Sequence, residues 1–548
     1  MKSDRDHILR AFVAILLLIG LANISSCKWG SWDLMGGDSI NQDGSGEDGG
    51  NNGGNNGDGD ISIFPPAVFT AARSGTKINE PVELFSSFED GSEIIALTGI
   101  INRGETGDGF KVSPDGTLVA YLTDQINGRF ELFVAPVDGV TSTRISPLLS
   151  ADGDVVEFKW SPDGSRIAYL ADVTIDKRFE LYTNLAEGGS NLKASGSLPI
   201  GGTVQAFEWS PNSSLLAYIA DQNSIGKFEL FSTPPTQQNS VQVSGTIVPN
   251  NGDVTEFAWS PGSSRIAYLS NQRLSALNEL YTSLPKGGGN VKVSAGDNIR
   301  EFVWAPDATT ESLAYSTERQ IFTVSPDGSS RTQVTPSLVI GGGISAFAWA
   351  PNSSRIAYLA DQRSAGVIEL YTVRPNGSDD LRVSGALVIG GNVTDFVWSP
   401  NSSFIAYRAN QDLAIIFELY ATTPDGRLSD TKVSGIPMAG DVEPLFAWSP
   451  DSARVAYRAN QRTADAIELF TSTPDGQFND RVSGNFLEGG NVEEFRWAPD
   501  NSGIGYLADQ ENGGVFELFA SLPDGEENAK LSGLIPGAGD VLFFEWVP

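Results

Sequence analysis

The sequence predicts an all-β protein: a single β-propeller of about ten four-stranded blades, closed by its C-terminal strand, over residues 61–548. A motif Phe-x-Trp-[Ser/Ala]-Pro recurs every 45–50 residues, and each interval contains four short runs of aromatic and β-branched residues. The chain holds 60 glycines and 29 prolines, and many of them stand between these runs, where tight turns need them. Units of this length bury their faces by stacking in a ring.

The strands can be assigned within one clear unit and are named A to D from the centre of the ring outwards. Strand A is expected at 442–450, B at 454–461, C at 467–474 and D at 480–484. Ser-Pro-Asp turns join A to B, and Thr-Pro-Asp-Gly turns join C to D. The motif opens units at Phe158, Phe207, Phe257, Phe302, Phe347, Phe396, Phe446 and Phe495, and Phe110 opens a variant unit that has Val112 in place of tryptophan.

The two ends of the repeat region complement each other. Residues 66–109 carry B-, C- and D-like strands but no Phe-x-Trp strand, whereas the chain ends on Phe544-Glu545-Trp546-Val547-Pro548. Pairing these ends would complete a tenth blade and leave no open sheet edge. Two smaller rings that share the ten units are the alternative; we favour one ring because no linker interrupts 61–548.

The N-terminal segment has a different character. Charged residues 1–10 precede an apolar run at 11–24, too short for a comfortable membrane span and typical of a signal peptide. The run ends in Ile24-Ser25-Ser26-Cys27, which resembles the lipobox of bacterial lipoproteins. The resemblance implies that signal peptide 1–26 is removed and that Cys27 is lipidated. Lys28, which is not aspartate, then implies anchoring in the outer membrane of the cell envelope, with the propeller facing either side. Residues 27–60, rich in Gly, Asn and Asp, are expected to form a flexible linker.

The repeats resemble the WD-repeat-like propeller units of the TolB family. Trp160-Ser161-Pro162-Asp163-Gly164 followed by Ile167-Ala168-Tyr169 carries the resemblance, which extends over 61–548. It implies a propeller that binds protein partners in the cell envelope. TolB proteins have an α/β domain before a six-bladed propeller, and this chain departs from that pattern. Related peptidases carry a catalytic domain outside the propeller, and no such domain is recognisable here.

Composition excludes several functions. The net charge is −32, which opposes binding to nucleic acid. His7 is the one histidine and Cys27 the one cysteine, so residues 61–548 have no histidine base for a catalytic triad and no His or Cys ligand for zinc. The sequence therefore predicts no catalytic residue, no cofactor and no enzymatic activity.

Three sets of polar residues recur with the repeat. Asx-Gln pairs end strand B at Asp124-Gln125, Asp221-Gln222, Asn271-Gln272, Asp361-Gln362, Asn410-Gln411, Asn460-Gln461 and Asp509-Gln510. A glutamate opens strand C at Glu83, Glu131, Glu180, Glu229, Glu279, Glu369, Glu418, Glu468 and Glu517. We interpret both sets as hydrogen bonding that closes the B–C hairpins rather than as sites for partners or ions. A third set precedes strand A and would ring the channel mouth, where weak Ca²⁺ binding is the alternative to a turn role: Asp154, Asp253, Asn298, Asn392, Asn491 and Asp540.

The repeat breaks at the unit that opens at Phe302. The connection before it is short, and so is its B–C turn. Both would lie on one face and form a notch, so we predict that a partner docks around Asp297, Arg300, Glu318 and Arg319; neutral drift of the repeat is the alternative. The sequence thus predicts a lipid-anchored, protein-binding scaffold. Two other functions stay open: an envelope hydrolase or lyase that uses carboxylates at the channel, and a surface adhesin.

Overall fold

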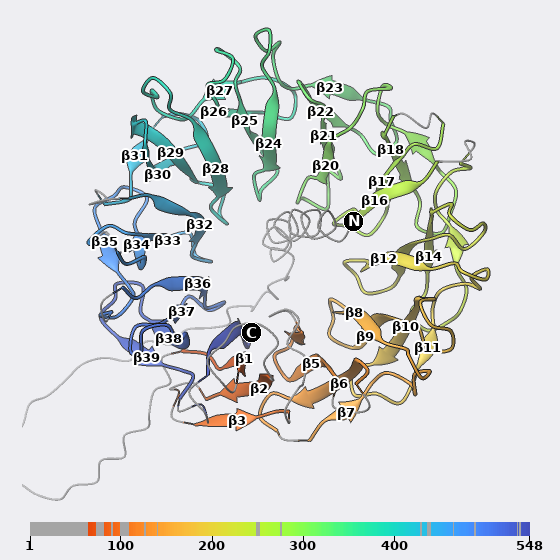
Figure 1. The fold of residues 1–548 in the computed structure, drawn as a ribbon. Helices are drawn as coiled ribbons and strands as arrows, with labels where there is room; N and C mark the ends of the chain where they lie inside the picture. Colours follow the sequence, from red (N-terminus) through yellow and green to blue (C-terminus); the bar gives the residue numbers. More distant parts are fainter. Residues whose placement is uncertain are drawn as a thin grey trace, which may run out of the picture. The chain divides into compact units, whose positions relative to one another are not determined.

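The computed structural model shows ten four-stranded antiparallel sheets arranged as one β-propeller (Figure 1). It describes residues 64–72, 82–88, 91, 93–98, 109–124, 128–139, 141–247, 252–273, 277–427, 430–435, 440–463, 465–486, 489–533, 535 and 539–548. Residues 63–548 form one compact unit, so the prediction of a single ring is confirmed and the alternative of two smaller rings is wrong. The predicted signal peptide, Cys27 and the linker lie outside the described residues.

The strands follow the predicted A-to-D order, and we number the blades from 1, which contains the first strand of the chain, to 10. Strands A of blades 1–10 are β40 (Val541–Trp546), β4 (Phe110–Val112), β8 (Val155–Trp160), β12 (Val204–Trp209), β16 (Val254–Trp259), β20 (Glu301–Trp304), β24 (Ile344–Trp349), β28 (Val393–Trp398), β32 (Val442–Trp448) and β36 (Val492–Trp497). Strands B are β1 (Ala67–Ala72), β5 (Leu118–Thr123), β9 (Arg166–Ala171), β13 (Leu216–Ala220), β17 (Ile266–Ser270), β21 (Leu313–Ser316), β25 (Ile356–Ala360), β29 (Ile405–Leu413), β33 (Val455–Ala459) and β37 (Ile504–Ala508).

The outer half of each blade is a hairpin of strands C and D. Strands C are β2 (Val82–Ser87), β6 (Glu131–Pro136), β10 (Glu180–Leu185), β14 (Glu229–Thr233), β18 (Glu279–Ser283), β22 (Ile321–Val324), β26 (Glu369–Val373), β30 (Ile416–Thr422), β34 (Glu468–Ser472) and β38 (Glu517–Ser521). Strands D are the short β3 (Ile94–Ala96), β7 (Thr143–Arg144), β11 (Leu192–Lys193), β15 (Val241–Gln242), β19 (Val291–Lys292), β23 (Arg331–Gln333), β27 (Leu381–Arg382), β31 (Thr431–Lys432), β35 (Asn479–Arg481) and β39 (Asn528–Lys530).

Each blade has two different faces, because side chains alternate along a strand. One face is aromatic: in blade 4, Tyr218 stacks on Phe231 with ring centroids 5.5 Å apart. The other face is small and aliphatic. The aromatic face of blade 4 packs against Ala168 and Leu170 of blade 3 in one buried cluster. The core is therefore a series of layers between blades, where small residues on one face leave room for rings on the next.

The tryptophan of each strand A links its blade to the one before. Its indole N–H donates to a backbone carbonyl of the preceding strand A, at 3.0–3.3 Å, in Trp160, Trp209, Trp259, Trp304, Trp349, Trp398, Trp448, Trp497 and Trp546. At the boundary of blades 1 and 2 the tryptophan is replaced by Val112. There the Glu545 carboxylate accepts hydrogen bonds from Lys111 Nζ (2.7 Å) and from the Val112 backbone N–H (3.0 Å).

The ring closes as the sequence predicts. Strand β40 pairs antiparallel with β1, in a register that places Trp546 opposite Ala67 and Phe544 opposite Phe69. The composite blade 1 therefore contains strands from both ends of the repeat region, in the order β3-β2-β1-β40. Phe544 is completely buried and packs edge-on against Trp546.

The closure makes a prediction about stability. We expect Phe544→Ala to cost about 3–5 kcal/mol in the free energy of unfolding, because it removes a fully buried ring. Phe495→Ala is the matched control, since Phe495 holds the same position in strand A of blade 10 and is 4% exposed. Urea titration should show similar costs for both variants in one cooperative transition. A cost for Phe544→Ala near zero would show that β40 is a peripheral addition to the ring.

Candidate functional site

The recurring strand C glutamates act within the fold. Glu369 accepts hydrogen bonds from Arg382 on strand D (2.7 Å) and from Tyr371 on its own strand (2.6 Å). Glu279 makes the same two contacts with Lys292 and Tyr281. The structural interpretation of this set is supported, but the predicted partner is wrong in these blades: the glutamate joins strand C to strand D rather than closing the B–C hairpin. Strand D pairs with strand C in a register that sets Arg382 opposite Tyr371, two residues from Glu369 on the same face of the sheet.

The Asx residue that ends strand B does close the B–C hairpin. One carboxylate oxygen of Asp361 accepts the backbone N–H of Gly366 in the B–C turn (2.8 Å), and the other accepts that of Gly343 before strand A (2.5 Å). The neighbouring Gln362 accepts a hydrogen bond from the Tyr358 hydroxyl at 2.7 Å. These side chains hold one end of the blade together.

The Asx residues before strand A join neighbouring blades. Asp253 accepts the backbone N–H of Phe228 in the preceding blade at 2.9 Å, and Asp540 accepts that of Phe516 at 2.8 Å. Asp441 does the same for Phe417, at 2.7 Å. Asp441 was not among the predicted residues, because its loop reads Ala-Gly-Asp-Val-Glu-Pro and departs from the repeat.

Metal and membrane features were also sought. Across the described residues, no group of three or more His, Cys, Asp or Glu side chains gathers as metal ligands would. Within the same residues, no helix has the length and apolar character needed to cross a membrane. Weak Ca²⁺ binding at the channel mouth stays a prediction.

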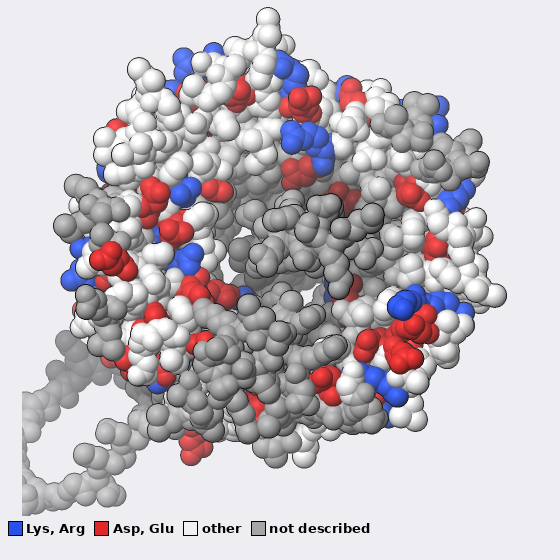
Figure 2. Space-filling model, in the orientation of Figure 1, with Lys and Arg blue, Asp and Glu red and all other residues white. Residues whose placement is uncertain are grey.

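Charged side chains of both signs are spread over the face of the ring seen in Figure 2. Two glutamates stand on adjacent innermost strands, Glu256 on β16 and Glu301 on β20. Desolvation raises the pKa of both. The pKa of Glu301 rises to about 7, first through desolvation and then through the negative charge of Glu256, while Arg300 partly offsets these effects. A carboxyl group with such a pKa could exchange protons near neutral pH.

Glu301 makes the stability of the folded protein depend on pH. Its pKa is higher in the folded chain than in the unfolded chain, so its stabilising contribution is complete below about pH 4.5 and is lost as the pH rises through about 7. We expect Glu301→Gln to raise the melting temperature by about 2 °C at pH 8 and to leave it unchanged at pH 4. The exposed Glu526→Gln serves as control in calorimetry at both pH values. An equal shift at pH 4 and pH 8 would contradict the assigned ionisation.

Blade 6 departs from the repeat on the face that carries the B–C turns. Its B–C turn spans 317–320, whereas that of blade 4 spans 221–228. The loop before it is also shorter, 293–300 against 243–253 before blade 5. The B–C turn of blade 6 contacts the first residue of the next strand A, since Ile344 N–H donates to the Glu318 carbonyl at 2.9 Å. The predicted notch, formed by the two shortened segments side by side, stays a prediction.

The four residues predicted for this notch make their contacts in two different places. Asp297 forms an ion pair with Arg331 of β23 (3.0 Å). Arg300 and Arg319 reach toward blade 7, donating to the carbonyls of Ile344 (3.2 Å) and Val339 (2.8 Å). Glu318 is exposed at the same boundary. The structure thus brings Arg300, Glu318 and Arg319 to the blade 6–7 boundary and engages Asp297 with the outer strand of blade 6.

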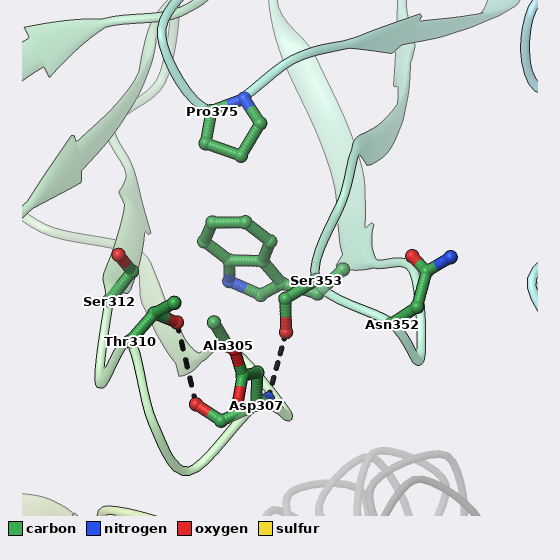
Figure 3. A pocket seen from close by; sticks show the side chains of 8 residues that line it. Ala305, Asp307, Thr310, Ser312, Asn352, Ser353 and Pro375 are labelled. Atoms are coloured by element: carbon green, nitrogen blue, oxygen red, sulfur yellow. Dashed lines mark hydrogen bonds between the residues drawn. The ribbon is translucent and has the colours of Figure 1, made fainter.

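The opposite face of this boundary carries a cavity of about 230 Å³ (Figure 3). Its lining consists of Ala305, Asp307, Thr310, Ser312, Trp349, Asn352, Ser353 and Pro375. We call this cavity the Trp349 slot. The Asp307 backbone N–H donates to Ser353 Oγ at 2.8 Å and joins the A–B turns of blades 6 and 7 beside it. The slot was not predicted, but one residue in the sequence indicates it. Ser312 stands where most blades have Arg, Leu or Phe before strand B.

The fold defines the class of protein as a ten-bladed β-propeller. No family model matches the chain. No curated protein matches it either.

Solved structures give three examples of similarity. One described as the eukaryotic initiation factor is 12% identical, with 88% of this chain and 99% of that chain covered and a TM-score of 0.45. Porphyromonas gingivalis dipeptidyl peptidase 4 is 13% identical, with 75% of this chain and 58% of that chain covered and a TM-score of 0.45. An oligogalacturonate lyase in complex with manganese is 11% identical, with 73% of this chain and 98% of that chain covered and a TM-score of 0.34. At these scores, none of the three bears on the function.

Proposed function

We propose that this chain is a lipid-anchored, TolB-like scaffold of the bacterial cell envelope that binds partner proteins and performs no catalysis. The observation that carries the proposal is that blade 6 departs from the repeat on both faces of the ring. Its B–C turn is short on one face, and the Trp349 slot opens on the other. Regular blades use their recurring polar groups to hold the ring together, so a specific partner needs an irregular place such as this one.

The notch supports a protein partner through its exposed charge. Glu318 and Arg300 are exposed, while Arg319 is half-buried and held by the Val339 carbonyl. A fixed backbone with charges of both signs favours one orientation of a docking protein. Charge reversal of Asp297, Arg300 or Arg319 would also break contacts within the fold, so Glu318 is the position at which binding can be tested most cleanly.

Photo-crosslinking tests this docking face. A photoreactive amino acid in place of Glu318 should give a discrete crosslinked product in intact cells, because this residue is exposed. The same substitution at Ser364, which is exposed in the longer B–C turn of blade 7, is the matched control and should give little product. Equal crosslinking at both positions, or none at either, would refute a docking face at blade 6.

The anchor is tested separately. Cys27→Ser should move the protein from the membrane fraction to the soluble fraction and abolish incorporation of labelled fatty acid. Cys27 is the one cysteine of the chain, so labelling through a thioether has a single candidate position. Cys27→Ser should leave the melting temperature unchanged. Membrane association that survives this substitution would reject the lipid anchor.

A hydrolase or lyase is the second candidate, favoured by Glu256 and Glu301. The pKa of both carboxyl groups is raised, and that of Glu301 reaches about 7, where a carboxyl group can act as a general acid or base near neutral pH. An adhesin that binds carbohydrate is the third candidate, and its natural position is the Trp349 slot, which combines an indole with polar side chains.

A further inference from the structure

A slot like that beside Trp349 recurs between blades. One wall is the residue before strand B, and the other is the tryptophan of the next blade. Phe404 of blade 8 stacks on Trp448 of blade 9, with ring centroids 6.0 Å apart and planes at 21°. Leu215 packs into the cluster that contains Trp259. At these two boundaries the side chain before strand B therefore fills the slot beside the tryptophan of the next blade.

Arginine fills the equivalent position in other blades. Arg454 precedes strand B of blade 9, and its Nη1 donates to Thr471 Oγ1 at 3.0 Å and to the Pro523 carbonyl of blade 10 at 3.2 Å. The guanidinium thus spans the two blades. Ser312 in blade 6 is too short to make either kind of contact.

The rest of the blade 6 A–B turn lines the slot without filling it, through Ala305, Asp307 and Thr310. The A–B turn of blade 6 runs from 305 to 312, longer than the 210–215 of blade 4. The additional length leans the other way, because Glu311 accepts hydrogen bonds from Ser260 and Ser264 of blade 5. On the blade 6 side the slot is lined by small or short side chains: Ala305, Asp307, Thr310 and Ser312.

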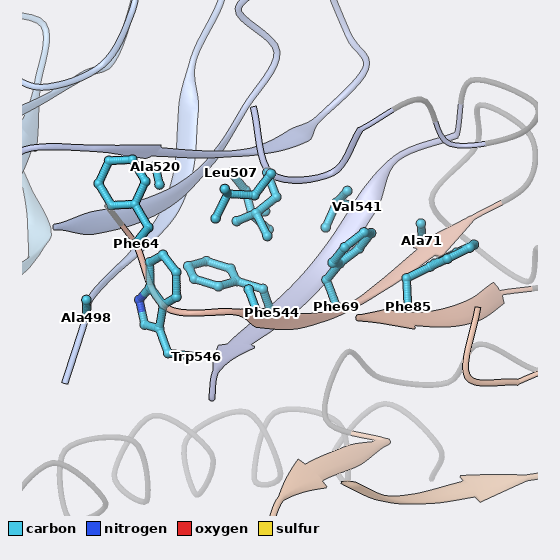
Figure 4. Packing of buried hydrophobic residues seen from close by; sticks show 13 residues of the cluster. Phe64, Phe69, Ala71, Phe85, Ala498, Leu507, Ala520, Val541, Phe544 and Trp546 are labelled. Carbon is cyan, nitrogen blue, oxygen red and sulfur yellow. The ribbon is translucent and has the colours of Figure 1, made fainter. Parts of the chain in front are cut away.

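The first blade shows what can enter such a slot from outside the blade. Gly503 stands at the position of Ser312, and Phe64, from the segment before β1, is buried beside Trp546 and Ala498 (Figure 4). A Cβ atom added to Gly503 would lie 2.5 Å from Phe64 Cε1, so the small residue is what makes room. Ala498 holds the place that Ala305 holds in blade 6, since each follows the tryptophan of its strand A.

The size of the slot also fits an aromatic ring. Sites for whole small molecules usually enclose about 300–1,000 Å³, and an apolar protein cavity of about 150 Å³ can bind benzene. The cavity of about 230 Å³ lies between these values. Polar side chains of Asp307, Asn352 and Ser353 border it, and their oxygens accept hydrogen bonds within the two A–B turns.

We infer that the Trp349 slot receives a phenylalanine-type side chain from an extended, proline-flanked segment of a partner protein, in the way that Phe64-Pro65-Pro66 enters the slot beside Trp546. The inference rests on the proposed scaffold function and adds the chemistry of the partner.

A labelled peptide with the sequence of residues 61–67, Ile-Ser-Ile-Phe-Pro-Pro-Ala, is the probe. Fluorescence anisotropy with the whole protein should show saturable binding. Ser312→Arg, which restores the residue of other blades, should weaken binding at least 10-fold, and Ser312→Ala should preserve it. A peptide with alanine in place of phenylalanine should bind at least 10-fold more weakly. Circular dichroism should show that both variants keep the wild-type fold.

Opening another slot gives an independent measurement. Phe404→Ser removes the ring that stacks on Trp448 and should add a second binding site, seen by calorimetry as a doubled stoichiometry. No binding of the probe to the wild type, an affinity for Ser312→Arg within 2-fold of the wild type, or equal binding of the alanine peptide would overturn the inference. Binding of methyl glucoside that Ser312→Arg abolishes, with no peptide binding, would assign the slot to carbohydrate instead.

The proposed scaffold function can fail separately. Crosslinks from position 318 that persist while the peptide does not bind would retain the scaffold and remove the slot from it. Peptide binding without any crosslink from position 318 in cells would retain the slot and refute docking at the notch.

Discussion

The hydrogen bond from each strand A indole to the backbone of the preceding strand A is the contact on which the ring depends. It is made near the centre, where neighbouring blades come closest, and it satisfies the one polar atom of a side chain that is otherwise packed in the core. It also fixes how far one blade lies from the next. The slot beside each tryptophan is a consequence of that spacing, and the residue before strand B decides whether the slot is filled. Where Val112 replaces tryptophan, Glu545 makes the link with its carboxylate.

Much of this architecture could be predicted from the sequence, because the same pattern of strands and turns recurs in each repeat. The Phe-x-Trp strand, the turn residues and the split first blade each indicate the same ring, and the structure confirms the pairing of β40 with β1. Contacts between distant parts of the chain were harder to foresee. Glu369 accepts a hydrogen bond from Arg382, and Phe64 fills the space that Gly503 leaves open. Both contacts depend on how strands and blades are arranged in space. The sequence grouped the four notch residues in one place, whereas in the structure Arg300 and Arg319 contact blade 7 and Asp297 pairs with Arg331 of blade 6.

The repeat separates what the fold needs from what a partner could use. A side chain that recurs in several blades, such as the aspartate that ends strand B, is engaged by the same backbone group of the B–C turn in blades 7 and 10. Blade 6 has lost several of these recurring features at once, including the strand C glutamate and the large residue before strand B. Loss of regularity costs packing, since a cavity remains beside Trp349. Such a cost is tolerable in a ring whose other boundaries are filled.

The composite first blade also has a consequence for biosynthesis. Strands β1, β2 and β3 leave the ribosome early, but the strand that completes their sheet is β40, which is synthesised after all the others. During translation the edge of β1 therefore has no native partner, and an unpaired edge is where chains associate wrongly. Sealing the ring also requires contact between residues more than 470 positions apart, for example Phe69 and Phe544, a slow step for a chain built otherwise from local hairpins. The nascent protein thus stays dependent on protection from aggregation until its final strand emerges.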